Sequence, residues 1–198
     1  MSKKVEQGLQ TRAHLVEVAT TLFAERGFAG TSTEDIVKAA NTTRGALYHH
    51  FESKEHLFVT VFEAVEEQVV AQVNASAMKG RTPLDMLRRG ISAFLDQCLD
   101  PAMQRIVLRD GLSVLGWERW YEIDVRYALG SVAAAVEAAI ASGQIPRQPV
   151  QPLAHLMLGA MNHAGLYIAG AADPAAARKE MERALRRVVD GLAGNEAR

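Results

Sequence analysis

The segment from Asn41 to Phe51, NTTRGALYHHF, carries side chains that can form directional hydrogen bonds with a partner. Arg44 can donate two parallel hydrogen bonds to a guanine, and Thr43 can bond a base edge or a phosphate. Gly45 has no side chain, so the backbone there can come close to another molecule. Together on one short segment, these residue types are suited to reading the base edges and phosphates of a DNA duplex.

Two short helices must position these groups. The first is predicted over TSTEDIVKAA, residues 31–40, because Thr31 and Glu34 have the spacing of a capping box. The second is predicted over residues 43–51, after a turn in which Asn41 tolerates a left-handed backbone. This spacing predicts a helix-turn-helix motif, whose second helix lies in the major groove with its N-terminal residues at the base edges.

Further side chains near this motif are candidates for contacts with the duplex. Tyr48 and His49 are placed toward the sugar-phosphate edge, although a half-buried core position is the alternative for Tyr48. Lys54 stands in the first turn of the next helix, where free amides and a cation can hold a phosphate. His49 and His50 have no partner at helical ligand spacing, so we interpret them as polar surface residues and predict no metal site.

The run from Thr11 to Phe58 resembles the amino-terminal domain of the TetR family of bacterial transcriptional repressors. The matching residues are Thr11, Arg12, Leu22, Phe23, Gly27, Phe28, Thr31, Ser32, Asp35, Ile36, Ala39, Ala40, Gly45, Leu47, Tyr48, Phe51, Ser53, Lys54 and Glu55. Asn41 stands where the family commonly has glycine, and Thr42 where it commonly has an apolar residue. The resemblance implies a homodimer that binds an operator with its first three helices and a small molecule in a divergent C-terminal helical domain.

With this resemblance, we expect a DNA-binding domain at residues 1–53 and a ligand-binding and dimerisation domain at residues 54–198, with residues 54–77 as a linking helix. The candidate DNA-contacting residues are Arg12, Thr31, Thr42, Thr43, Arg44, Gly45, Ala46, Tyr48, His49 and Lys54.

Helical periodicity continues through the rest of the chain, so we predict an all-α fold of about nine helices. A first helix is predicted over about residues 9–26, and one long helix from about Trp117 to Ala141. Capping side chains before Pro83, Pro101 and Pro174 mark three helix starts. The last two helices are predicted over residues 153–171 and 174–192.

Aromatic and sulfur-containing residues are frequent in the C-terminal part, and most of them are expected in the core. Asn162 and His163 interrupt an apolar run, and pockets combine apolar walls with a few polar groups. For these two residues, a structural hydrogen bond and a ligand contact both remain open. The candidate residues for binding a small apolar or aromatic effector are Phe94, Met103, Trp117, Trp120, Tyr121, Met161, Asn162, His163 and Tyr167.

The last two helices are also the expected dimer interface, because a palindromic operator needs a two-fold symmetric protein. Small residues permit close helix approach in the first of them, and the second has an apolar stripe. The interface candidates are Gly165, Ala169, Met181, Leu185, Val188, Val189 and Leu192. Ordinary packing within one chain is the alternative.

Composition limits the remaining function classes. The 198 residues include 22 Lys and Arg and 23 Asp and Glu, so the net charge of −1 gives no global signal for a polyanionic partner. The single Cys98 excludes an internal disulfide and favours a reducing, cytoplasmic compartment. We expect no secretory signal, and Asn162 and His163 argue against a membrane span at residues 153–172. No cofactor is predicted.

We therefore predict a ligand-responsive repressor without catalytic activity. Cys98, the one nucleophile candidate, lies on an apolar helical stripe without a histidine at local spacing. Two alternatives remain: a constitutive DNA-binding protein whose C-terminal core is filled, and a small-molecule enzyme or binding protein that uses the same fold. Effector-driven release of an operator and catalytic turnover would distinguish these three possibilities.

Overall fold

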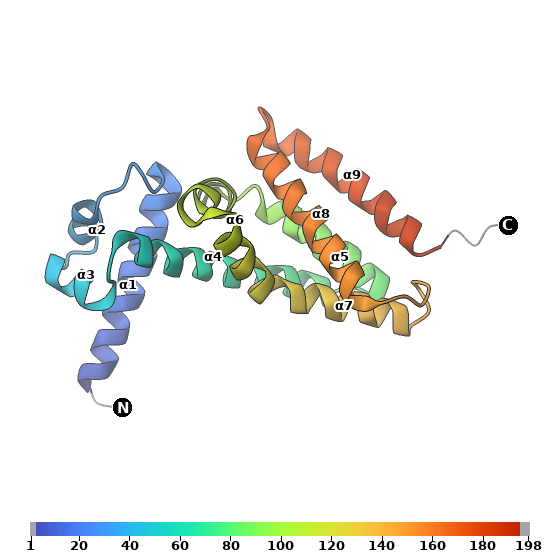
Figure 1. Ribbon diagram of the computed structural model, residues 1–198, viewed down its shortest axis with the longest axis horizontal. Coiled ribbons are helices and arrows are strands. Elements are labelled where there is room, and N and C mark those ends of the chain that lie inside the picture. The colour runs from blue at the N-terminus through green and yellow to red at the C-terminus, as the bar shows by residue number, and fades with distance from the viewer. Residues whose placement is uncertain (1–2, 195–198) are drawn as a thin grey trace. The chain divides into compact units, whose positions relative to one another are not determined.

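The computed structural model describes residues 3–194, in which helices joined by turns and loops are the regular secondary structure and no strand occurs (Figure 1). The predicted all-α fold is confirmed. In chain order the elements are α1 (Lys3–Arg26), α2 (Thr33–Ala39), α3 (Arg44–His50), α4 (Lys54–Ala77), α5 (Pro83–Gln97), η1 (Met103–Asp110), α6 (Gly111–Asp124), η2 (Val125–Leu129), α7 (Gly130–Ala141), α8 (Val150–Gly170) and α9 (Pro174–Leu192), where η marks a π-helical segment.

The chain forms two compact units. Residues Met1–Val65 and Pro101–Glu118 make up one, called the N-terminal unit below, and residues Glu66–Asp100 and Arg119–Arg198 make up the other, the C-terminal unit. The helix α4 contributes its first half to one unit and its second half to the other. The N-terminal unit therefore extends past the predicted domain boundary at residue 53. It includes the first half of α4 and also residues 101–118.

Specific contacts attach this second segment to the loop after α1. The Asp110 Oδ2 atom accepts a hydrogen bond of 2.6 Å from the backbone N–H of Phe28. The Arg105 guanidinium covers Gly27, where an added Cβ would lie 2.2 Å from a guanidinium nitrogen. Gly27 also has a φ of +74°, a left-handed conformation that favours glycine, and the flexible Arg105 side chain packs in the space where a Cβ would stand.

Aromatic packing forms the core of the N-terminal unit. The Phe28 ring lies 5.9 Å from the Phe23 ring and 5.1 Å from the Phe58 ring, and Phe23 and Phe58 are 5.4 Å apart between centroids. The two contacts of Phe58 are edge-on, an arrangement that stabilises a core beyond the area that it buries. Helices α1, α2 and α3 pack against one another around it, as Figure 1 shows.

The helix-turn-helix geometry follows from local caps. Asn41 has a φ of 47°, which confirms the left-handed turn residue. The predicted capping box is wrong by one residue: Ser32 and Asp35 exchange the reciprocal hydrogen bonds at the start of α2. Thr31 is buried instead, and its hydroxyl donates toward the carbonyls of Leu22 and Gly27.

The C-terminal unit is a helical bundle in which α8 packs on α7 and α9, while α5 packs on α7, α8 and α9. Its helix starts at Pro83 and Pro174 are confirmed, with Thr82 and Asp173 as the N-caps. The core contains Leu84, Leu87, Ile91, Phe94, Leu95, Val136, Ala139, Leu153, Met157, Leu158, Ile168, Leu185 and Val189.

The predicted uninterrupted helix from Trp117 to Ala141 is wrong. Residues 125–129 are π-helical, and α7 begins only at Gly130. Gly116, just before the predicted start, has φ 76° and ψ 164° and breaks the helical path inside α6. In a π-helical segment the hydrogen bonds span five residues instead of four, so each turn is wider. Neither a π-helical segment nor a break at glycine changes the spacing of apolar residues, which is why the sequence predicted one helix. None of the helices in the described part of the chain is long and apolar enough to cross a membrane.

Candidate functional site

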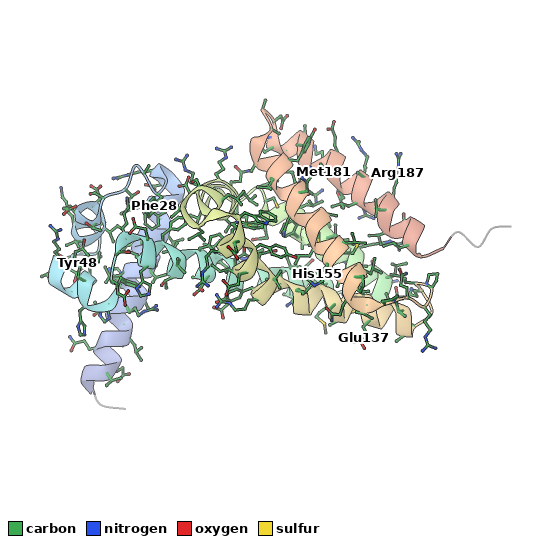
Figure 2. All side chains as sticks on the ribbon, viewed as in Figure 1. Phe28, Tyr48, Glu137, His155, Met181 and Arg187 are labelled. Atoms are coloured by element: carbon green, nitrogen blue, oxygen red, sulfur yellow. The ribbon has the colours of Figure 1, made fainter. Side chains whose placement is uncertain are left out.

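Helix α3 exposes one face and buries the other. Leu47 and Phe51 are almost completely buried and fix the helix on the N-terminal unit. Arg44, Gly45 and His49 are exposed, and Tyr48 is 41% exposed on the outer side of α3 (Figure 2). The structure therefore brings the predicted reading residues together on one accessible face.

The Arg44 side chain is exposed, and its present partners hold it weakly. Its Nη1 atom lies 3.3 Å from Glu34 Oε1, and its guanidinium lies 5.5 Å from the centre of the Tyr48 ring. About two thirds of both ionic side chains is exposed, and such ion pairs contribute little to stability. Arg44 can therefore leave Glu34 for a base edge at a small cost.

Thr43 and Gly45 shape the N-terminal end of α3. The Thr43 hydroxyl caps the helix by accepting a hydrogen bond of 3.1 Å from the backbone N–H of Ala46. A Cβ added at Gly45 would meet only Thr43 Oγ1, at 3.9 Å, so the protein itself leaves room for a side chain. The missing side chain therefore keeps the outer surface flat rather than relieving an internal clash.

Three predicted DNA contacts are engaged inside the N-terminal unit. Thr31 is 1% exposed, so its side chain holds the α1–α2 loop and cannot reach a duplex; this prediction is wrong. The Lys54 Nζ atom donates to the carbonyls of Phe28 and Thr31 at 2.9 and 3.1 Å, and lies 4.0 Å from the centre of the Phe28 ring. Arg12 lies over the Phe51 ring and donates to Thr60, so Lys54 and Arg12 position the motif.

A polar recess of about 330 Å³ lies between the N-terminal half of α1 and the α2–α3 turn. It is lined by Gln7, Gln10, Thr11, His14, Leu15, Ala40, Asn41 and Thr42. Thr42 is thus half-buried at this recess, and Ala46 is half-buried on α3. The sequence did not indicate the recess, because its two walls are about 30 residues apart in the chain.

The adjacent rings of His49 and His50 are 5.1 Å apart. Burial, then the neighbouring His49 and Arg12, lowers the pKa of His50. Among the described residues, no group of three or more His, Cys, Asp or Glu side chains is arranged to hold a metal ion.

The predicted effector-binding residues are distributed over both units. Phe94, Trp120, Met161 and Asn162 are buried in the C-terminal unit, and Tyr121 is half-buried there. His163 and Tyr167 are exposed on α8, so a contact with an effector would have to be made at the surface of this helix. Met103 and Trp117 belong to the N-terminal unit, where Met103 is buried and Trp117 is exposed.

The C-terminal unit contains a small apolar cavity of about 50 Å³. Its lining comes from α4, α5, α7 and α8 and consists of Val73, Asn74, Ala77, Met86, Leu87, Gly90, Ile91, Ser131, Val132, Ala135 and Met161. The Asn74 and Ser131 side chains are hydrogen-bonded to each other at 3.1 Å. The other lining residues are apolar. Of the predicted effector-binding residues, Met161 lies in this lining.

A buried polar cluster formed by Glu66, Asp124 and Asn162 lies in the same unit. The Asn162 amide donates a hydrogen bond of 2.6 Å to Asp124 Oδ2. Burial and the nearby Asp124 raise the pKa of Glu66 to about 8, and burial raises the pKa of Asp124 to about 6 against the opposing effect of Asn162. Two carboxyl groups are thus buried together, which favours their protonated forms.

Sequence analysis missed both carboxyls, although their spacing contained a signal. Glu66 follows Phe62 by four residues and precedes Val69 by three, so it lies on the apolar stripe of α4. Asp124 likewise follows the buried Trp120 by four residues. An acidic residue at a core position of a helix is the observation that could have identified them.

The predicted interface residues also fall into two groups. Gly165, Ala169, Leu185 and Val189 are buried within one protomer, so their surfaces are already covered by the same chain. Met181 and Leu192 are half-buried and Val188 is exposed on α9, the helix that carries Met181 and Arg187 in Figure 2. A seam on α8 and α9 must therefore use the exposed residues beside the buried stripe.

Comparison with known proteins gives two matching family models. Residues 15–61 match "Bacterial regulatory proteins, tetR family", and residues 84–192 match "Tetracyclin repressor-like, C-terminal domain". The transcriptional regulator AcrR of Shigella flexneri is 34% identical over 110 residues, which are 54% of this chain and 51% of AcrR. This chain therefore spans about half the length of AcrR.

Two further proteins match over more of the chain. The transposon Tn10 TetC protein of Escherichia coli is 26% identical over 159 residues, or 79% of each chain. The crystal structure of a TetR-family transcriptional regulator from Pectobacterium atrosepticum is 32% identical, with a TM-score of 0.87 over 97% of both chains.

Proposed function

Because this chain belongs to the TetR family of bacterial regulatory proteins, we propose that it is a DNA-binding transcriptional repressor that a small molecule releases from its operator. The observation that carries the proposal is the exposed N-terminal end of α3. Arg44, Gly45 and Tyr48 are accessible there, while Leu47 and Phe51 hold the helix from behind. A recognition helix needs this arrangement to enter a major groove.

Selection from a random duplex library tests the DNA-binding proposal directly. The purified protein should enrich a two-fold symmetric sequence with half-sites about one helical turn, roughly 34 Å, or a multiple of it apart. Its affinity for that sequence should fall steeply with salt, because phosphate contacts release counterions. Enrichment of no sequence, or binding that salt does not affect, would contradict the proposal.

We propose that the protein acts as a homodimer through α8 and α9. Leu156 on α8 is 72% exposed and Val188 on α9 is 53% exposed, which is unusual for large apolar side chains. A Cβ added at Gly159 or Gly191 would meet nothing within 4 Å, so both helices have flat surfaces that allow a second copy to approach closely.

The dimer has a test that leaves the protomer core intact. Leu156→Glu combined with Val188→Glu places charges on the proposed seam, and sedimentation should then show a folded monomer. Met78→Glu is the matched control, since Met78, at the start of the α4–α5 turn, is as exposed as Leu156. A double variant that stays dimeric would place the interface elsewhere.

The proposal assigns binding of a small apolar or aromatic effector to the C-terminal unit. Linkage requires that DNA weaken effector binding by the same factor by which the effector weakens DNA binding. Calorimetric titration with and without operator measures both affinities. Equal effector affinities in the two titrations would leave a constitutive DNA-binding protein.

A non-catalytic role fits the chemistry of Cys98. Burial, together with the charges of Glu66 and Asp96, raises the pKa of this thiol to about 12. The thiolate is the reactive form of cysteine, so Cys98 is a poor nucleophile at neutral pH. Turnover of a small molecule by the purified protein would contradict this part of the proposal.

A further inference from the structure

The cavity of about 50 Å³ in the C-terminal unit has one polar end and one apolar end. Asn74 on α4 and Ser131 on α7 form the polar end, where Asn74 is exposed and its side-chain amide donates a hydrogen bond of 3.1 Å to the Ser131 hydroxyl. Gly90, Ile91 and Met161 line the other end, and all three are buried. The cavity therefore runs from a polar mouth at the surface to an apolar floor inside the helical bundle.

Gly90 leaves the floor of this cavity open. It lies in the middle of α5, where glycine is less favourable for the helix than alanine. A Cβ added at Gly90 would meet Ala77 Cβ at 3.6 Å and Val73 Cγ1 at 3.7 Å, which are ordinary contact distances. Alanine would therefore fit, so neither helix geometry nor close packing requires glycine at this position. Because Ala77 and Val73 also line the cavity, the space of the missing side chain belongs to the cavity.

Two methionines border the cavity and make its size adjustable. Met86 on α5 and Met161 on α8 are lining residues. Methionine has three rotatable side-chain bonds and fills irregular spaces, so these two side chains can move to admit a ligand. The cavity volume is about one third of the roughly 150 Å³ that holds a benzene ring in an engineered apolar cavity. A narrow aliphatic chain fits this space with less rearrangement than an aromatic ring.

The lining also determines which charge the occupant can carry. Among the described residues, no Asp, Glu, Lys, Arg or His side chain lines the cavity. A charged group would lose its hydration there without gaining a partner, which is strongly unfavourable. We propose that the cavity binds an uncharged molecule with a short aliphatic chain and one hydrogen-bonding head group, the chain on the Gly90 floor and the head at Asn74 and Ser131. This inference rests on the proposed function and specifies the chemical class and the binding site of its effector.

The two polar side chains at the mouth can hold such a head group. The Asn74 amide has a second N–H and a carbonyl oxygen besides the N–H that bonds Ser131, and the Ser131 hydroxyl can donate as well as accept. A ligand hydroxyl can thus donate and accept at the mouth while the bond between the two side chains persists. These hydrogen bonds fix the orientation of the ligand, and burial of its chain supplies most of the affinity.

Methionine methyl resonances test the site directly. The probe is n-butanol, added at pH 7 without DNA to protein that carries isotope-labelled methionine methyl groups. The Met86 and Met161 signals should shift and then saturate, whereas those of Met78 and Met181, which do not line the cavity, should stay in place. Leucine substitution of each methionine in turn assigns its signal. Shifts that do not saturate, or that are equal at all four methionines, would overturn the inference.

Matched probes test the charge and the size of the occupant. Both n-butylamine and butanoate keep the same chain but are charged at pH 7, and they should bind at least about tenfold more weakly than n-butanol. Phenol carries a neutral hydroxyl on a ring, and it should also bind more weakly because the ring exceeds the volume of the cavity. Binding of any of these three probes as tight as that of n-butanol would contradict the inference.

Two variants assign the binding to the two ends of the cavity. Gly90→Ala places a methyl group on the floor and should weaken n-butanol binding by about fourfold, the equivalent of one buried methylene. It should also raise the unfolding temperature, because alanine favours the helix, so the loss of binding is not a loss of folding. Ser131→Ala should weaken binding by roughly fivefold, as for one hydrogen bond. The control is Gly170→Ala, at a helical glycine of α8 whose added Cβ would meet nothing within 4 Å. Unchanged affinity in either cavity variant would contradict the site.

Operator binding by the same wild-type sample separates this inference from the proposed function. If n-butanol binds at the two lining methionines and no operator is found or released, the cavity site stands and the proposed function is wrong. If an operator is bound and another small molecule releases it, while n-butanol leaves both methionines unchanged, the cavity site is wrong and the proposed function stands.

Discussion

The two units use their charged side chains in opposite ways. In the N-terminal unit, Arg44 is exposed beside an exposed carboxylate, so its present interaction is weak and exchangeable. In the C-terminal unit, Glu66 and Asp124 are both buried, and burial raises the pKa of each carboxyl. An exposed pair can exchange one partner for another at little cost. A buried carboxyl instead keeps its proton to a higher pH, because burial disfavours its charged form.

The largest expected effect concerns the pH dependence of the C-terminal unit. Burial raises the pKa of Glu66 from 4.5 to about 8, so the folded state keeps a proton that the unfolded state loses. Stability should therefore decrease as pH rises through this window. Asp124 acts in the same direction, but only up to its own pKa of about 6. Between pH 6 and 8, Glu66 alone should reduce the free energy of unfolding by up to about 1.4 kcal/mol per pH unit.

Urea unfolding at several pH values checks this prediction. Glu66→Gln should remove most of the slope between pH 6 and 8, whereas Glu67→Gln, an exposed neighbour, should keep it. Parallel pH profiles for the wild type and Glu66→Gln would show that the Glu66 carboxyl is not desolvated. The contrast between the exposed Arg44–Glu34 pair and the buried carboxyls would then disappear.

The sequence predicted the N-terminal unit better than the C-terminal one, and the reason is distance along the chain. Leu47, Phe51 and the turn residue Asn41 belong to one continuous motif, in which local spacing determines which side chains face outward. Glu66, Asp124 and Asn162 meet only because α4, α6 and α8 fold together. The local sequence pattern does not show which residues of distant helices come into contact. The sequence signal for these buried carboxyls is an acidic residue on an otherwise apolar helix stripe.

The errors inside the motif have a different origin. Thr31 and Ser32 are adjacent and both can cap a helix, so the sequence could not decide which of them faces the interior. Lys54 was expected to hold a phosphate, but its flexible side chain reaches the carbonyls of Phe28 and Thr31. A lysine at a helix start can bind either an external anion or nearby carbonyls, and tertiary packing decides between them.

The second prediction uses Lys54 to separate positioning from DNA contact. Lys54→Met removes the donor from two backbone carbonyls, so the N-terminal unit should lose about 1.5–3 kcal/mol of stability, as for a hydrogen bond from a charged group. Hydrogen exchange of peptides within residues 5–65 measures this loss. The slope of log affinity against log salt should stay unchanged, and a decrease of about 0.9 would identify a phosphate contact instead. Lys79→Met, an exposed lysine of the C-terminal unit, is the control.

The third prediction concerns the reading of a base by Arg44. Arg44→Ala should weaken binding to the selected operator by about 1–3 kcal/mol and relax the preference at one base pair of each half-site. The N-terminal unit should remain as stable as before, because the exposed Glu34 pair contributes little. Affinities for all single-base operator variants provide the measurement. Uniform weakening across these variants would mean that Arg44 touches only the phosphate backbone.

The smallest expected effect comes from the partner that Arg44 must leave. The Glu34 carboxylate lies 3.3 Å from the Arg44 guanidinium and is itself exposed. When Arg44 turns to a base on DNA, we expect the Glu34 carboxylate to be left facing the phosphates. Glu34→Gln removes that repulsion and frees Arg44, and it should therefore tighten operator binding by a few tenths to about 1 kcal/mol. The gain should shrink at high salt, because exposed charges are then screened. Glu52→Gln, which removes an exposed carboxylate just after α3, controls for the change in net charge alone. Equal gains from the two variants would show that Arg44 is not held back by Glu34. The exchange that distinguishes the exposed pair from the buried carboxyls would then have no part in recognition.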